Sequence, residues 1–331
     1  MGDKSRNYLL DNLKVALIVL VVLGHALKNI DADIGLRSVY IFIFMFHMPL
    51  FVFVSGYFSK NVDKCRRNAV KDLLIPFIVF NIIWYACAGN FEFPIYYAGW
   101  TLWYLLSLFF WRFFLKDLIR IKWILGISIV LGLLVGFIDH GAMLSLSRTF
   151  AFLPFFLLGY YTKGSMIRKI KGTPKVISLI GLMAIGALAF SIAGYQGLDY
   201  KFLYMSQSYE SLGLGVGQGS LLRIIGYMVA LLVSLFVINL VPSRKLNLSR
   251  IGANTMVVYL GHIYILRFLN GFVPTFHSSL ANFLITLGFS VLICVVLSLP
   301  SFMKLYNVVF GKFYEVLYRL YTKEKSITTN R

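Results

Sequence analysis

The chain has 331 residues, of which 59% are hydrophobic and 14% charged, and its formal net charge is +19. No soluble domain of this size has such a composition, so the sequence excludes a soluble fold and predicts an integral membrane protein. In a soluble protein the positive charge would suggest a nucleic-acid partner. Here basic cytosolic loops explain it, and we expect no nucleic-acid partner.

Apolar segments of helical length follow one another along the chain. They do not alternate strictly between apolar and polar residues, so they predict helices rather than the strands of a barrel. The predicted spans are residues 12–28, 38–58, 72–89, 99–115, 122–138, 149–162, 175–195, 220–241, 252–270 and 280–299. The predicted fold is all-α: a polytopic membrane protein with about ten transmembrane helices, forming a single domain over residues 1–331.

Lysine and arginine are concentrated in the loops that follow the even-numbered spans. These loops are residues 59–71, 116–122, 163–175 and 244–250. An even number of spans with both termini in the cytosol places nearly all of the excess positive charge on the cytosolic side. We therefore expect a multi-pass protein of the cell membrane with both termini in the cytosol.

The first span carries two ionisable residues, Lys14 and His25, with an apolar segment between them. Eleven residues at about 100° each return a helix to within roughly 20° of its starting face and about 16 Å further along. Ionisable groups inside a membrane segment are costly and usually face an internal site. The pattern predicts a path from the cytosolic edge to a reaction centre deep in the bilayer. A structural histidine and a snorkelling lysine are the alternatives.

The second span contains another histidine, His47, two residues before Pro49. The proline removes one helical hydrogen-bond donor and loosens the helix around His47. A polar cavity between the first two spans would account for both histidines, and a simple kink with a structural histidine is the alternative.

The loop after the second span is strongly basic and includes Lys60, Arg66 and Arg67. Such a loop could bind anionic lipid headgroups. It could equally hold the phosphates of a nucleotide-like cofactor, because arginine forms bidentate contacts with phosphate.

Further candidate residues lie on later spans. Trp103 and Tyr104 lie near the start of the fourth span, and Arg148 precedes the sixth on the outer side. Arg223 lies just inside the eighth span, where it could face an outer polar site or snorkel to the interface. His262 lies on the ninth span.

Residues 301–322 differ from the spans because charged residues recur there at helical spacing opposite an apolar side. The charged residues are Lys304, Lys312, Glu315, Arg319 and, just beyond, Lys323. This pattern predicts an amphipathic helix on the cytosolic membrane surface, with an extension of the tenth span as the alternative.

The three cysteines, Cys65, Cys87 and Cys294, show no CxxC spacing. This argues against a disulfide framework or a zinc site, and we expect no bound metal.

Together, these motifs resemble the integral-membrane acyltransferase 3 family, in the branch of fucose 4-O-acetylases. The matching pieces are Asp11-Asn12-Leu13-Lys14 with His25, the run Phe46–Tyr57, Arg66-Arg67, Leu102-Trp103-Tyr104-Leu105, the run Pro154–Tyr160, and Thr255…Tyr259-x-x-His262. The family usually has arginine where this chain has Lys14, which keeps the charge but loses the planar fork of donors.

The resemblance implies an O-acetyltransferase of a bacterial cell membrane, with acetyl-CoA entering from the cytosol and a cell-surface or lipid-linked glycan as acceptor. It implies that His25 acts as the general base on a sugar hydroxyl. An acyl-histidine intermediate is a second route.

The remaining site residues combine this resemblance with the candidate residues described above. The donor's phosphates would be held by Lys14, Lys60, Arg66 and Arg67. The acceptor pocket would be lined by His47, Trp103, Tyr104, Arg148, Arg223 and His262. Membrane lipids are expected partners, and self-association into a homo-oligomer is left open. A transporter or flippase for a glycan or anionic substrate is the alternative function, since it too needs buried polar groups and a bent helix.

Overall fold

The computed structural model describes residues 7–27, 31–92, 94, 96–139, 141–195, 197–248, 251–252, 254–269, 278–312 and 314. Within these residues the chain is helical, with one isolated β-bridge between Tyr97 and Met143 and no strand. The prediction of an all-α fold is confirmed.

The helices are α1 (Tyr8–Ala26), α2 (Ile34–Tyr57), α3 (Val62–Ala69), α4 (Ile75–Cys87), α5 (Trp103–Leu118), α6 (Ile124–Leu134), α7 (Leu146–Tyr161), α8 (Gly164–Gly172), α9 (Lys175–Gly194), α10 (Val216–Leu240), α12 (Thr255–Leu269) and α13 (Ser279–Leu297). A π-helical turn (Val70–Leu74) joins α3 to α4, and short 3-10 helices cover Val135–Phe137, Tyr200–Tyr204 and Glu210–Leu212. A further helix occupies residues 300–312.

Each predicted span overlaps one of these helices. Among the described residues, 6 continuous helical segments are long and apolar enough to cross a membrane: 8–26, 34–57, 62–87, 175–194, 216–240 and 279–297. The segments 124–137 and 255–269 are apolar but shorter, and α5 and α7 have 16 residues each. The chain is therefore a membrane protein with several spans, and the count of about ten stays a prediction.

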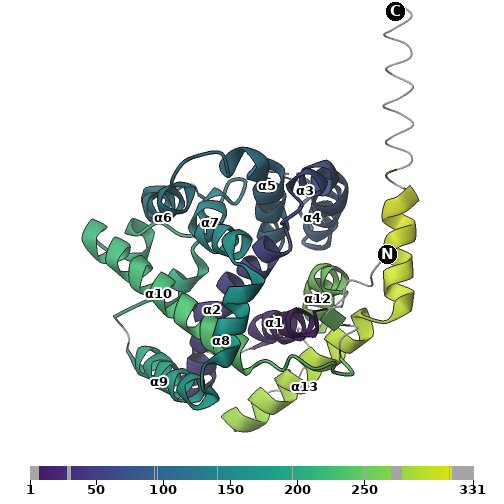
Figure 1. Ribbon diagram of the computed structural model, residues 1–331. Helices are drawn as coiled ribbons and strands as arrows, with labels where there is room; N and C mark the ends of the chain where they lie inside the picture. The colour runs from purple at the N-terminus through teal and green to yellow at the C-terminus, as the bar shows by residue number, and fades with distance from the viewer. Residues whose placement is uncertain are drawn as a thin grey trace, which may run out of the picture.

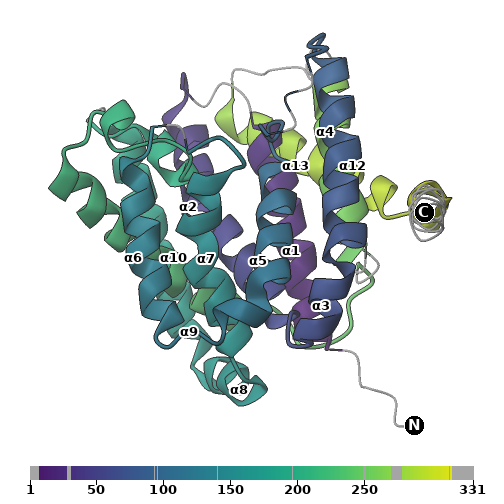
Figure 2. The same cartoon turned by 90° about the horizontal axis from the view of Figure 1, so that it is seen from above.

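Two helices form the centre of the bundle, which Figure 1 shows along its axis and Figure 2 from the side. In the most apolar part of α1 and of α2, 67% and 72% of the residues are buried, against 17% in α9. The peripheral helices α9, α10 and α13 leave many large apolar side chains exposed. Such a surface is stable only in contact with lipid or another apolar partner.

Helices α2 and α7 make the closest crossing of the bundle through two glycines. A Cβ atom on Gly56 would lie 1.9 Å from the carbonyl oxygen of Phe156, and one on Gly159 would lie 1.9 Å from that of Phe53. Only hydrogen fits at either position, so the two backbones touch directly. Small residues allow this kind of contact between membrane helices.

The two ends of the bundle differ in charge. Helices α3 and α8 lie at the same end as the N-terminus of α1 (Figure 2), and we call this the basic end because it carries the predicted cytosolic loops. Two ion pairs fasten α3 to α5 there. Arg66 contacts Asp117 at 2.7 Å, and Lys116 contacts Asp63 at 2.8 Å.

The helix at residues 300–312 runs across the bundle axis: it lies in the plane of Figure 1 and is seen end-on in Figure 2. Phe310 stacks on Phe80 of α4 at a ring distance of 6.0 Å, while Leu305 and Val308 are exposed. This direction fits a helix parallel to a membrane surface. Residues 315–322 of the predicted interfacial helix lie outside the described residues.

Candidate active site

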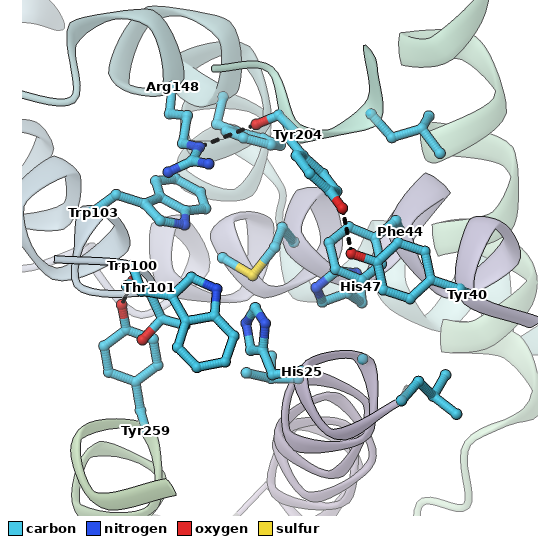
Figure 3. Close-up of a pocket in the computed structure, with 16 residues that line it drawn as sticks. His25, Tyr40, Phe44, His47, Trp100, Thr101, Trp103, Arg148, Tyr204 and Tyr259 are labelled. Atoms are coloured by element: carbon cyan, nitrogen blue, oxygen red, sulfur yellow. Dashed lines mark hydrogen bonds between the residues drawn. The ribbon is translucent and has the colours of Figure 1, made fainter. Parts of the chain in front are cut away.

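A cavity of about 340 Å³ opens among the helix ends opposite the basic end. We call it the histidine cavity (Figure 3). Its polar and aromatic lining consists of His25, Tyr40, Phe44, His47, Trp100, Thr101, Trp103, Arg148, Phe152, Tyr204 and Tyr259. These residues come from α1, α2, α5, α7 and α12, from the segment before α5 and from the 3-10 helix Tyr200–Tyr204, so the cavity exists only in the assembled bundle.

His25 lies in the last turn of α1, one residue before its end. The predicted span ran to residue 28, whereas α1 stops at Ala26, so His25 lies near the helix end. Its depth in the bilayer stays a prediction. Its ring packs edge-on against Trp100 at 5.1 Å and stacks on His262 at 5.6 Å. No hydrogen bond joins His25 to another described residue, so aromatic packing alone holds its ring.

His47 lies midway along α2 and is 1% exposed. Its Nδ1 is 2.8 Å from the carbonyl oxygen of Ile43. A carbonyl can only accept, so Nδ1 carries the proton and Nε2 is left with a lone pair. Phe44 separates the two histidines, with ring distances of 6.3 Å to His25 and 4.7 Å to His47.

His262 is completely buried in α12. Its Nδ1 lies 2.7 Å from the carbonyl oxygen of Tyr259, which assigns the proton to Nδ1, and its Nε2 has no hydrogen-bond partner among the described residues. His262 supports the ring of His25 from behind and is not part of the cavity lining.

Arg148 enters the histidine cavity from the first turn of α7. Its Nε donates to the carbonyl oxygen of Tyr204 at 3.1 Å, and its guanidinium lies 5.0 Å from the centre of the Trp103 ring. Trp103 in turn stacks on Phe152. Figure 3 shows Arg148 across the cavity from His25.

A second cavity, of about 210 Å³, lies nearer the basic end and contains two cations, Lys14 and Arg112. We call it the basic cavity. Lys14 pairs with Asp11 at 3.0 Å and lies 5.0 Å from the ring of Phe58. Arg112 donates from Nε to the hydroxyl of Ser59 at 3.2 Å. Arg112 is not among the residues predicted for the site, although its place in the apolar run of α5 was the available signal.

Tyr259 separates the two cavities and lines both of them. Its hydroxyl donates to the carbonyl oxygen of Thr101. Tyr104, which was predicted to line the acceptor pocket, lies on the basic side of this partition, where its hydroxyl bonds that of Ser55 at 2.6 Å. The partition is therefore two tyrosines thick, and both are anchored by hydrogen bonds.

A third cavity, of about 330 Å³, meets the histidine cavity at His25 and Trp100. It lies among α1, α4, α12 and α13 and is mostly apolar, with Arg267 at its edge. His25 is thus reachable from two separate spaces.

The structure does not bring Arg223 to any of these cavities. Its side chain is completely buried, donates to the carbonyl oxygen of Gly132 at 2.9 Å, and lies 4.6 Å from the centre of the Tyr209 ring. These contacts join α10 to α6, so Arg223 has a packing role here.

The predicted phosphate-binding residues of the 59–71 loop do not line the basic cavity either. Lys60 donates to the carbonyl oxygens of Gly159 and Thr162 and so caps the end of α7. Burial lowers the pKa of Lys60. Arg66 is paired with α5, and Arg67 is exposed on α3.

Among the described residues, no group of three or more His, Cys, Asp or Glu side chains could hold a metal ion.

Comparison with known families matches residues 7–299 to an acyltransferase domain. The chain is similar to nodulation protein NolL of Sinorhizobium fredii (strain NBRC 101917 / NGR234), with 32% identity over 187 residues, or 48% of this chain and 49% of the relative. It is also similar to nodulation protein NolL of Mesorhizobium japonicum (strain LMG 29417 / CECT 9101 / MAFF 303099), with 34% identity over 94 residues, or 25% of each chain. The chain spans about half the length, or less, of these curated relatives. No solved structure matches.

Proposed function

Because this chain belongs to the acyltransferase 3 family, we propose that it is a membrane O-acyltransferase that moves an acyl group, first of all acetyl, from acyl-CoA to a hydroxyl of a cell-surface or lipid-linked glycan. We place it in a bacterial cell membrane with the basic end in the cytosol. Family membership favours this function over a transporter or flippase.

One observation carries the proposal: a cavity with two cations and a cavity with two histidines approach each other from opposite ends of the bundle and share Tyr259. The first suits the phosphates of CoA, which are confined to one end of that donor. The second suits a hydroxyl acceptor and a base. The reacting thioester lies at the far end of the long pantetheine arm, so it can reach forward while the phosphates stay at Lys14 and Arg112.

In the proposed reaction, the imidazole of His25 takes the proton of the acceptor hydroxyl as its oxygen attacks the thioester carbonyl. The bond between carbonyl carbon and sulfur then breaks, and the imidazolium returns its proton to the departing thiolate. The lone pair on Nε2 of His47 can accept a hydrogen bond from the acceptor and orient it. The partition at Tyr104 and Tyr259 must move aside for the thioester to reach His25.

A transfer assay tests the proposal. It uses purified protein in nanodiscs, acetyl-CoA labelled in the acetyl group, and bacterial cell-surface or lipid-linked glycans as acceptors. We expect label to enter the glycan with wild type and not with His25→Ala, while both proteins keep the same melting temperature. Movement of unmodified glycan across a membrane without any acetylated product would instead identify a transporter or flippase.

A further inference from the structure

We propose that the acceptor carries an anionic group, a carboxylate or a phosphate, and that the guanidinium of Arg148 binds this group in the histidine cavity. The inference rests on the proposed function and names the chemical class of its acceptor.

The contacts of Arg148 with the described residues engage only part of its guanidinium group. Only Nε is engaged, on the carbonyl oxygen of Tyr204, and the flat face of the guanidinium lies over Trp103. The two terminal nitrogens make no hydrogen bond with the described residues. A guanidinium held in this way presents a fixed pair of donors, which matches the two oxygens of a carboxylate or phosphate.

The histidine cavity supplies no counter-charge for Arg148. Neither Asp nor Glu occurs among its lining residues, and Arg148 forms no ion pair with any described residue. By contrast, Arg66 at the basic end has Asp117 as its partner. A cation in a largely aromatic cavity is costly unless something pairs with it. An anionic ligand would supply that partner.

The anion bound here is not expected to be the donor's phosphate group. Arg148 and His25 lie at the end of the bundle opposite Lys14 and Arg112, and the tyrosine partition stands between the two cavities. An acceptor anchored at Arg148 would lie in the space between it and His25. There the indole ring of Trp100, which lines the cavity, offers an aromatic surface for a sugar ring.

Two sources of the anion fit this chemistry: the carboxylate of a uronic acid, and the phosphate that joins a sugar to a lipid carrier. Matched ligands separate them. We would titrate nanodisc-embedded protein with glucose, glucuronate and glucose 1-phosphate at constant ionic strength. The same titration would be repeated with galactose, galacturonate and galactose 1-phosphate. The fluorescence of the cavity tryptophans reports binding, and the labelled acetyl-transfer assay gives KM and kcat for each acceptor.

We expect at least one acidic sugar to bind about tenfold or more tightly than its neutral counterpart. Arg148→Gln should remove this preference by raising the KM of the acidic acceptor alone. Arg148→Lys, which keeps the charge but not the paired donors of the guanidinium, should keep part of the preference for the acidic acceptor. Lys201→Gln removes an exposed cation from the same end of the bundle and should leave the preference unchanged. Melting temperatures confirm that each variant is folded.

Equal binding of neutral and acidic sugars by wild type would overturn the anion site. So would an unchanged preference in Arg148→Gln, or an equal fall in kcat for both acceptors, which would place Arg148 in the reaction itself. Neutral sugars acetylated with the same KM as acidic ones would leave the proposed function standing without the anion site. Acidic sugars bound through Arg148 but never acetylated would support the anion site and contradict the proposed function.

Discussion

The three described histidines of the membrane bundle differ in what holds their rings. His47 and His262 are each fixed by a backbone carbonyl of their own helix, whereas His25 is held by aromatic packing only. In both fixed rings the hydrogen bond at Nδ1 leaves a lone pair on Nε2, so the tautomer alone does not select the base. Its place at the meeting of two cavities favours His25 as the base.

We expect His25→Ala to lower acetyl transfer by about 10²–10⁴-fold, the usual range for losing general-base help, with CoA binding and melting temperature nearly unchanged. His262→Ala is the matched control. It removes a completely buried ring that supports His25, so it should lower the melting temperature as well as the rate. Full turnover by a folded His25→Ala protein would contradict the assignment.

The cations at the basic end also differ in whether other parts of the protein already bind them. Arg112 lines the basic cavity, whereas Lys60 is committed to α7 and Arg66 to Asp117. We predict that Arg112→Gln weakens CoA binding by roughly ten- to a hundredfold, the value of a charge-assisted contact, and lowers its dependence on salt. Calorimetric titration of CoA checks this. A larger loss of affinity in Arg67→Gln than in Arg112→Gln would move the donor site to the surface of α3.

At the scale of elements, the crossing of α2 and α7 is the tightest constraint on the site, because these helices carry His47 and Arg148. An added methyl at Gly159 would meet a backbone carbonyl that cannot rotate away. We expect Gly159→Ala to cost about 1–3 kcal/mol or more of stability, and to lower folded yield and activity together.

Gly186→Ala is the control for that substitution. Gly186 lies in α9 with nothing within 4 Å of an added Cβ atom, so alanine there should be neutral or stabilise the helix by up to about 1 kcal/mol. Thermal unfolding followed by light scattering compares the two variants. Equal melting temperatures would mean that the crossing can loosen without loss.

The existence of the long apolar helices could be predicted from the sequence, but their ends could not, and α3 and α8 lie in segments predicted as loops. Apolar content set the predicted spans at 12–28 and 38–58, while capping side chains set the observed ends: Asn7 bonds the amide of Leu10 and Asp33 bonds that of Leu36. These caps extend the N-terminal end of each helix beyond its apolar part, whereas the C-terminal end of α1 comes at Ala26, two residues before the predicted end.

The candidate site was predictable where a polar residue interrupts an apolar helix. His25 and His47 stand out in this way, whereas Arg148 was predicted just before its span, and the structure brings all three to one cavity. Arg223 has the same sequence signal but bonds a carbonyl of α6, and only tertiary packing reveals that partner. Arg112, in the apolar run of α5, carried the same signal and was not predicted as a site residue.

At the scale of the whole molecule, the charge difference between the two ends predicts orientation. We expect a cysteine introduced as Ser211→Cys to react with a membrane-impermeant maleimide in intact cells, and Asn61→Cys to react only after the membrane is permeabilised. Both positions are exposed, so accessibility within the fold does not bias the comparison. Labelling of Asn61→Cys in intact cells would contradict this orientation and place the basic end outside the cell.

The central claim is that donor and acceptor approach His25 from opposite ends of the bundle. Sealed proteoliposomes with the protein in one known orientation test it most directly, with labelled acetyl-CoA supplied only to the compartment that contacts the basic end and the glycan acceptor only to the other. We expect acetylated glycan in the acceptor compartment, and its loss in His25→Ala. Product that forms only when both substrates share one compartment would contradict it.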